Sequence, residues 1–232
     1  MSRRTQREDK VDNVAAEQLA TLSKPTSAAA EAYRTLRTNL LYDALVDVPS
    51  KVIVLTSPGV REDTGTVCAN LGVVLAQAGR STLVVDCDLR NPVLHEIFGL
   101  REPQSRGIVD VVTGERSLED AWQEPLPDLK VITGIPSPLD PMEILGSERF
   151  TRFLGQMRRD FDLVLIDAPP TGLVSDAAIL AAQSDGVLIV SDYENTRKRD
   201  VRQAMRSLEA VRANVLGTVL TGVKAPKDAY RR

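Results

Sequence analysis

The stretch at residues 52–71 constrains the fold more than any other part of the chain. It opens with a run of β-branched and aliphatic residues, turns at 57–59 and continues in a helical pattern. This strand–loop–helix order is typical of a phosphate-binding loop, in which backbone N–H groups and a helix N-terminus face an anion. The loop chemistry departs from that pattern, because residues 60–64 contain neither glycine nor lysine and add Glu62 and Asp63.

Composition sets broad limits on the kind of protein. The chain has 232 residues, is 43% hydrophobic and 26% charged, and carries a net charge of −3, all ordinary for a globular protein. This charge balance, taken alone, predicts no nucleic-acid or membrane partner. We expect Cys68 and Cys87 to be small buried hydrophobic residues of a cytoplasmic protein rather than a disulfide.

The order of apolar segments predicts the architecture. Residues 1–24 are polar and lack periodicity, so we expect a flexible N-terminal tail or linker. From residue 25 to residue 223, near-continuous apolar strands alternate with helical patterns. This predicts one α/β domain of three layers around a mostly parallel sheet. Residues 224–232 form a basic C-terminal tail that contains Tyr230.

A predicted helix at 25–45 carries charged residues on one side. Glu31, Arg34 and Arg37 follow one another at intervals of three, opposite the apolar residues of the same helix. Taken alone, this spacing favours a solvated face with an ion pair between residues three apart.

Three acids stand at the ends of predicted strands. Asp86 and Asp88 end the second strand, and Asp167 ends a later one. In an open parallel sheet, ligands bind outside the carboxyl ends of the strands, where such acids hold Mg²⁺ through water. The alternative is that each acid caps the helix or turn that follows it. Three acids beside a phosphate-type loop favour a nucleotide-binding fold.

Four separated segments, at 31–40, 84–95, 140–145 and 165–170, carry a resemblance to a known family. Their sequences and their order resemble the bacterial tyrosine kinases of capsule and exopolysaccharide synthesis. The resemblance covers roughly residues 20–223. It implies a P-loop fold related to the Min/Par-type ATPases, with Mg-ATP as the family's cofactor.

The same resemblance implies partners and a location. Members of this family work with a membrane-anchored polysaccharide co-polymerase, fused or separate, at the inner face of the cell membrane. In the family, the helix that matches 25–45 drives assembly between subunits. Glu31, Arg34 and Arg37 therefore become expected residues of a homo-oligomer interface, in place of the solvated face that the spacing alone favours.

The resemblance also makes the departures specific. When Asn70 and Leu71 are matched to the family's Asn-Leu, the catalytic lysine position falls at Thr64 and the Mg²⁺-binding hydroxyl at Gly65. The two loop glycines fall at Arg61 and Asp63, so that what remains of the loop is Gly59 and Thr66.

Other parts of the expected site are also reduced. Thr221 stands where the family has an asparagine facing the base, and Tyr230 remains of the tyrosine cluster that accepts phosphate. The resemblance leaves vestigial catalytic roles for Asp86, Asp88 and Arg90. Asp86 and Asp167 would hold Mg²⁺ through water only with a nucleotide present.

We therefore predict weak or absent Mg-ATP binding and a non-catalytic regulator or scaffold of exopolysaccharide or capsule synthesis and export. One alternative is a weak tyrosine autokinase, with Arg61 reaching a phosphate and Tyr230 as acceptor. A partition-type ATPase is disfavoured by the altered loop and by the charged helix at 25–45. An iron protein with a shared cluster is disfavoured by the positions of Cys68 and Cys87.

Overall fold

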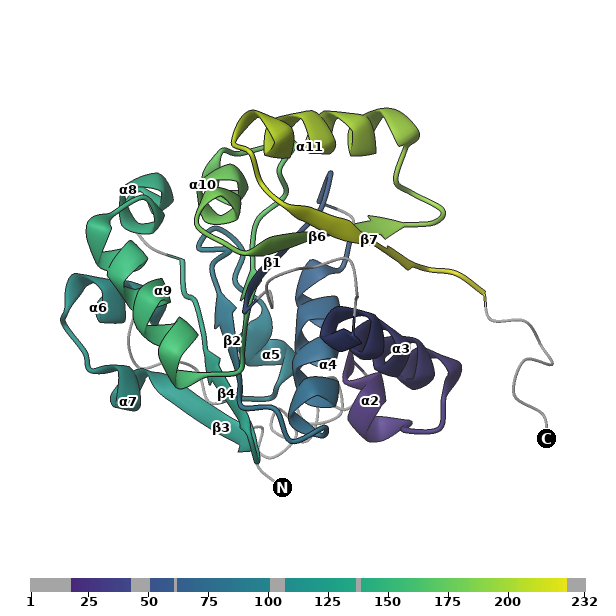
Figure 1. Cartoon of the computed structure of the whole chain (residues 1–232), viewed down its shortest axis with the longest axis horizontal. Coiled ribbons are helices and arrows are strands. Elements are labelled where there is room, and N and C mark those ends of the chain that lie inside the picture. Colours follow the sequence, from purple (N-terminus) through teal and green to yellow (C-terminus); the bar gives the residue numbers. More distant parts are fainter. Residues whose placement is uncertain (1–17, 43–50, 61, 101–106, 137–138, 225–232) are drawn as a thin grey trace, which may run out of the picture.

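The fold is a sheet with helices on both faces (Figure 1). The computed structural model describes residues 18–42, 51–60, 62–100, 107–136 and 139–224. Two of the predicted site residues, Arg61 and Tyr230, lie outside these ranges.

Within the described ranges, seven strands form one sheet in the order β3-β4-β2-β5-β1-β6-β7. The strands are β1 (Val52–Thr56), β2 (Thr82–Asp86), β3 (Trp122–Leu126), β4 (Leu129–Ile132), β5 (Leu163–Asp167), β6 (Gly186–Asp192) and β7 (Val215–Thr221). All neighbouring pairs are parallel except β3 with β4. Every residue of β1, β2 and β5 is buried, as expected for strands covered on both faces. The predicted three-layer, mostly parallel α/β fold is confirmed.

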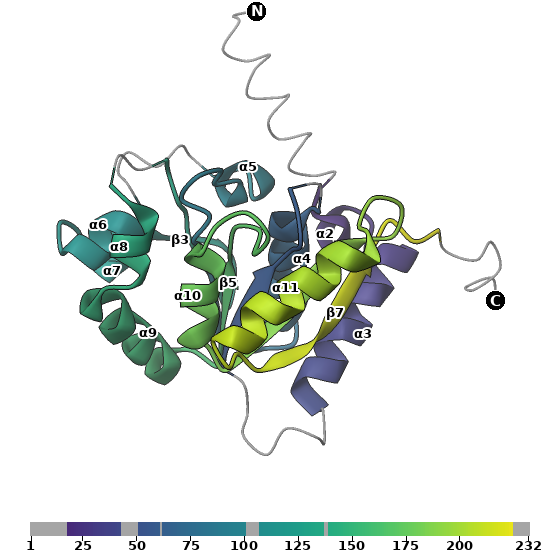
Figure 2. The ribbon, with the colours of Figure 1, turned by 90° about the horizontal axis from the view of Figure 1, so that it is seen from above.

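The helices divide into two layers. They are α2 (Ala20–Ser23), α3 (Ala28–Tyr42), α4 (Thr64–Ala76), α5 (Leu94–Ile97), α6 (Ile108–Thr113), α7 (Leu118–Ala121), α8 (Pro141–Leu145), α9 (Glu148–Asp160), α10 (Asp176–Ala182) and α11 (Lys198–Ala210). One hydrophobic cluster joins the sheet to α6 and α8–α11, and a second joins it to α4, α5 and the apolar side of α3. The view from above shows α9, α10 and α11 on one side of the sheet (Figure 2). Cys68 and Cys87 are buried free thiols, as predicted.

The edge strand β3 was not predicted. Pro125 lies within it, and a proline is tolerated only where a strand can lack one backbone donor. The strand pairs antiparallel with β4, and the Lys130 ammonium lies 3.7 Å from the centre of the Trp122 ring. A cation over an indole ring is favourable, so this contact helps to hold the edge in place.

The prediction of a flexible tail at 1–24 is wrong for its last part. Residues 18–24 pack on α4, and Leu19 and Thr21 are buried. The Asn70 amide holds them there: its oxygen accepts from Thr21 N (3.1 Å) and Thr21 Oγ1 (2.9 Å), and its nitrogen donates to the Gln18 and Thr66 carbonyls (2.9 Å each). A buried amide with all these partners stabilises the contact, which the polar composition of the segment conceals. Residues 1–17 lie outside the described ranges.

Candidate functional site

The carboxyl ends of β1, β2 and β5 meet at one edge of the sheet. β5 lies between β2 and β1, and Asp86 is the register partner of Asp167. The loop after β1 runs along the same edge and enters α4. The loop therefore lies beside these carboxylates: a Cβ added at Gly65 would lie 3.1 Å from Asp167 Oδ2.

The loop carries two carboxylates, of which Glu62 is half-buried and Asp63 is exposed. A Cβ added to Gly59 would lie 3.4 Å from Glu62 Oε2, so the Glu62 carboxylate lies against the glycine. Glu62 Oε1 accepts a hydrogen bond of 2.5 Å from Thr196 Oγ1 in the loop after β6. This contact joins residues 134 positions apart, and no sequence signal identifies Thr196.

Asp63 caps the helix that follows the loop. α4 begins at Thr64, and the Asp63 side chain accepts from Thr66 N at 3.3 Å. A carboxylate at an N-cap satisfies a free backbone donor and interacts favourably with the positive end of the helix dipole. The helix N-terminus that would face a phosphate is therefore already paired with a negative side chain of the chain itself.

Gly65, at the position predicted for the Mg²⁺-binding hydroxyl, is packed against residues from outside the loop. A Cβ at Gly65 would lie 2.5 Å from Val93 Cγ2 and 3.1 Å from Asp167 Oδ2. The first distance is far below a van der Waals contact, so Val93 occupies the space that a serine or threonine would need. Thr64, at the lysine position, is buried, and the buried Thr66 hydroxyl makes no hydrogen bond.

The residues predicted to be vestigially catalytic have structural partners. Asp86 Oδ2 accepts from Val93 N and Leu94 N, both at 3.0 Å, and so caps the short helix α5. Asp88 Oδ1 accepts from the backbone N–H of Arg90 (3.2 Å) and of the next residue (3.0 Å), which closes a turn. The capping role considered for these acids in the sequence is therefore present.

The Arg90 side chain contacts α10. Its Nε lies 2.9 Å from Oδ2 of Asp176, a residue whose side chain is only 1% exposed. The hydrogen bond to Asp176 raises the pKa of the Arg90 guanidinium. Arg90 thus neutralises the buried carboxylate of Asp176 on α10. In the described structure the Arg90 guanidinium is therefore already bound to another side chain.

The two buried carboxyl groups resist ionisation. Burial raises the pKa of Asp86 to about 7, against the opposing effect of the two N–H groups it accepts from. Burial, and then the charge of Asp86, raise the pKa of Asp167 well above its usual range. Within the described residues, no group of three or more His, Cys, Asp or Glu side chains is placed to hold a metal ion. The expected role of Asp86 and Asp167 toward Mg²⁺ therefore remains a prediction.

Thr221 lies apart from the loop, at the far edge of the sheet. It is the register partner of Asp192, and its hydroxyl lies 3.4 Å from the Ser191 carbonyl. Its backbone carbonyl accepts from Tyr193 N in the loop after β6, the loop that also provides Thr196. Thr221 is thus linked to the loop after β1 through Tyr193 and Thr196 of the loop after β6.

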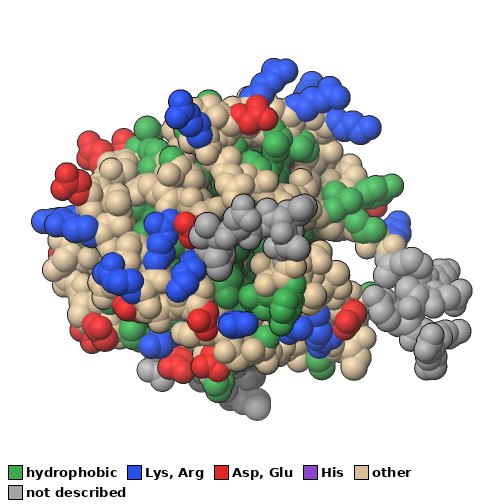
Figure 3. All heavy atoms as spheres, in the orientation of Figure 1, with side chains coloured by type: hydrophobic (Ala, Val, Ile, Leu, Met, Phe, Trp, Pro, Cys, Tyr) green, Lys and Arg blue, Asp and Glu red, His purple; other side chains and the backbone are tan. Residues whose placement is uncertain are grey.

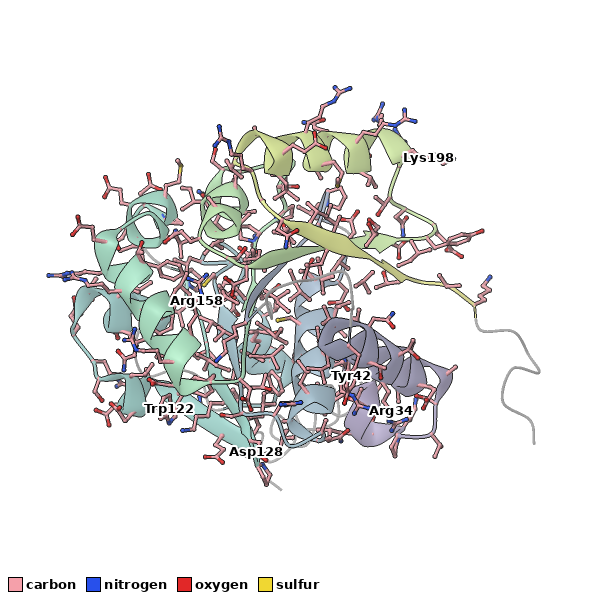
Figure 4. All side chains as sticks on the ribbon, viewed as in Figure 1. Arg34, Tyr42, Trp122, Asp128, Arg158 and Lys198 are labelled. Atoms are coloured by element: carbon pink, nitrogen blue, oxygen red, sulfur yellow. The ribbon has the colours of Figure 1, made fainter. Side chains whose placement is uncertain are left out.

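The three charged residues of α3 are paired within the chain. Arg34 Nη1 lies 2.8 Å from Glu31 Oε2, and Arg34 Nη2 donates to the Pro25 carbonyl (2.7 Å). Arg37 Nη1 donates to the Val74 carbonyl of α4 at 3.2 Å. Figure 4 places Arg34 on α3, beside α2. The ion pair expected from the spacing is present, and the arginines brace α3 against its neighbours.

α3 also lies close to the altered loop. Burial, with a smaller contribution from the charge of Asp63, raises the pKa of Tyr33 to about 12. The helix expected to join subunits and the first residues of α4 therefore share an electrostatic environment.

The class of protein follows from this fold and from the position of the loop. The family model described as an AAA domain matches residues 51–219, so the chain is a P-loop NTPase-type protein. Among curated proteins, the tyrosine-protein kinase YwqD of Bacillus subtilis (strain 168) is 34% identical over 90% of this chain and 87% of its own length. Among solved structures, the kinase domain of the Escherichia coli tyrosine kinase ETK superposes with a TM-score of 0.82, at 28% identity over 92% of this chain and 84% of that one.

The chain belongs to the bacterial tyrosine-kinase family. It spans a smaller part of some longer relatives: the putative tyrosine-protein kinase EpsB of Ralstonia solanacearum is 34% identical over 86% of this chain but only 26% of that protein. No helix of the described part is long and apolar enough to cross a bilayer.

Proposed function

We propose that this chain is a non-catalytic member of the bacterial tyrosine-kinase family that acts as a scaffold or regulator of exopolysaccharide or capsule synthesis. The observation that carries the proposal is the altered loop, in which Glu62 and Asp63 turn carboxylates toward the anion-binding positions. Val93 fills the space beside Gly65. These residues do not fit a bound Mg-ATP, whose phosphates need N–H donors and cations at the same positions.

The remaining surfaces support an assembly role. The charged helix α3 resembles the family's subunit interface in sequence, and hydrogen bonds from Arg34 and Arg37 hold it against its neighbours. As a scaffold, the chain would form a homo-oligomer through α3 and bind a membrane-anchored polysaccharide co-polymerase at the cytoplasmic face of the cell membrane. Neither role needs phosphate transfer.

Replacing Asp88 by asparagine tests the non-catalytic role. Asparagine keeps a side-chain oxygen that can accept the two backbone bonds of the Asp88 turn, while it removes the charge that a kinase would use. We expect Asp88→Asn to restore polysaccharide production in a deletion strain as well as the unaltered chain does. A loss comparable to the deletion, with the variant folded and present at normal levels, would instead assign the chain a catalytic role.

The interface on α3 is testable by light scattering. Removing both guanidinium groups, in Arg34→Ala with Arg37→Ala, is expected to shift any oligomer toward monomer because charged pairs across an interface are lost. A second variant, Glu31→Arg with Arg34→Glu, keeps an ion pair between positions 31 and 34 while reversing the charges offered to a partner. The oligomer of this charge-reversed variant should dissociate as far as that of the double-alanine variant. The matched control is Arg152→Ala with Arg159→Ala on α9, which should leave the mass unchanged. An unchanged mass in both α3 variants would show that the charged side of α3 is exposed to solvent and is not a subunit interface.

A further inference from the structure

The outer side of α11 is strongly basic. Lys198, Arg199, Arg202 and Arg206 are all exposed, and we call these four residues the α11 basic face. Lys198, Arg202 and Arg206 recur every four residues, so they form a single row about 12 Å long on one side of the helix. Figure 3 shows Lys and Arg side chains gathered along the edge of the molecule over α11, and Figure 4 places Lys198 at one end of the helix.

The start of α11 contradicts the usual rules for a helix. Arg197 stands at the N-cap without a side-chain cap, and two further basic residues follow it. Positive side chains at the positive end of a helix dipole are unfavourable, and acidic residues are preferred there. One acid, Asp200, offsets part of this charge through an ion pair of 3.2 Å with Arg199. Residues that weaken a helix are expected mainly at functional sites. An anion bound at the N-terminus of α11 would offset the repulsion between its basic side chains and the helix dipole.

Exposed apolar side chains lie beyond the same end of α11. Tyr193, in the loop before the helix, is 66% exposed, and Leu220 of β7 is 51% exposed. Val219 packs on the cluster that contains α4, so the next residue, Leu220, points to the α11 side of the sheet. Tyr193 N donates to the Thr221 carbonyl, which places the two exposed side chains at the same corner.

We propose that the α11 basic face, with Tyr193 and Leu220, binds the surface of a bilayer that contains anionic phospholipids. Guanidinium groups match phosphate geometry, and a tyrosine and a leucine beside them suit the boundary between headgroups and acyl chains. The row lies on the outside of one straight helix rather than in a groove, which fits a flat surface better than a nucleic-acid duplex. The net charge of −3 conceals this patch, in which four basic side chains outnumber the two acids of α11, Asp200 and Glu209.

This inference rests on the proposed function, because contact with a bilayer would orient a scaffold at the membrane. Its test does not need the polysaccharide co-polymerase. The full chain is sedimented with vesicles of phosphatidylcholine alone or mixed with phosphatidylglycerol. We expect binding to the mixed vesicles only, and loss of binding at raised salt because exposed charges are screened. Arg202→Ala with Arg206→Ala is expected to weaken partitioning about 30-fold, at the usual contribution of each basic residue near an anionic surface.

Controls separate a specific face from general charge. Arg152→Ala with Arg159→Ala removes the same charge from exposed positions on α9 and should leave partitioning unchanged. Tyr193→Ser should weaken binding without altering net charge. An equal loss in the α9 control, no preference for anionic vesicles, or binding of duplex DNA in place of vesicles would each overturn the proposal. None of these outcomes would affect the Asp88→Asn result, so the proposed function is judged separately.

Discussion

Calorimetric titration of this chain with Mg-ATP is expected to show no saturable binding below the millimolar range. A carboxylate about 4 Å from a phosphate is repelled by roughly 4 kcal/mol at an effective dielectric constant of 20. Asp63 and Glu62 both lie where the loop would meet phosphates. The lysine that is missing at Thr64 removes a charge-assisted bond worth about 1.5–3 kcal/mol. Half of this sum lowers the affinity by two or three powers of ten.

Restoring the loop sequence alone is not expected to restore binding. The variant Arg61→Gly, Asp63→Gly, Thr64→Lys and Gly65→Ser introduces a Cβ at position 65 that would lie 2.5 Å from Val93 Cγ2. We expect this four-fold variant to be less stable and still weak in binding. Adding Val93→Ala removes the clashing methyl group, and only the five-fold variant should recover part of the Mg-ATP affinity, since Glu62 stays in place.

The matched control is Val93→Ala in the otherwise unaltered chain, which keeps the acidic loop and should not bind. A micromolar dissociation constant for the unaltered chain would contradict the proposal of a non-catalytic protein. Tight binding by the four-fold variant would show that Val93 moves aside easily and that the loop residues alone prevent binding.

Asp167→Asn is expected to stabilise the chain at neutral pH. Asp167 is 3% exposed, and its pKa lies well above the usual range because of burial and the charge of Asp86. The unfolded chain loses this proton near pH 4, whereas the folded chain retains it. The folded state therefore binds more protons as the pH rises, and its stability falls. A neutral amide of the same shape removes this cost.

The same reasoning gives the shape of the pH profile. Asp86, whose pKa moves from 3.8 to about 7, should make the unaltered chain lose stability between about pH 4 and pH 7. Urea unfolding at several pH values measures both effects: Asp167→Asn should match the unaltered chain near pH 4 and exceed it near pH 7. Asp160→Asn, at an exposed position that ends α9, serves as the control and should change stability by less than about 0.5 kcal/mol. A variant with Asp167→Asn that is less stable at pH 7 would show that this carboxylate is ionised and held by a partner.

Much of the architecture could be predicted from local patterns. Apolar runs such as β1 and β5 identify buried parallel strands, and their order with the helices gives the three layers and the edge at which the site lies. Patterns failed where a contact between distant segments decides the structure. The polar composition of residues 18–24 predicts a tail, whereas hydrogen bonds to the Asn70 amide hold this segment on α4. The proline in β3 argues against a strand, and the strand forms because it lies at the edge of the sheet.

The sequence by itself determined the fold and the family, and it predicts a chemical defect of the loop, because a missing lysine and added carboxylates are properties of residue type. Only the tertiary structure decided how that defect is accommodated. Glu62 is paired through Thr196 and Gly65 is covered by Val93, and these contacts arise when segments distant in the chain are brought to one edge of the sheet. The α11 basic face is likewise invisible in a net charge of −3, since only folding exposes its four basic side chains on one helix.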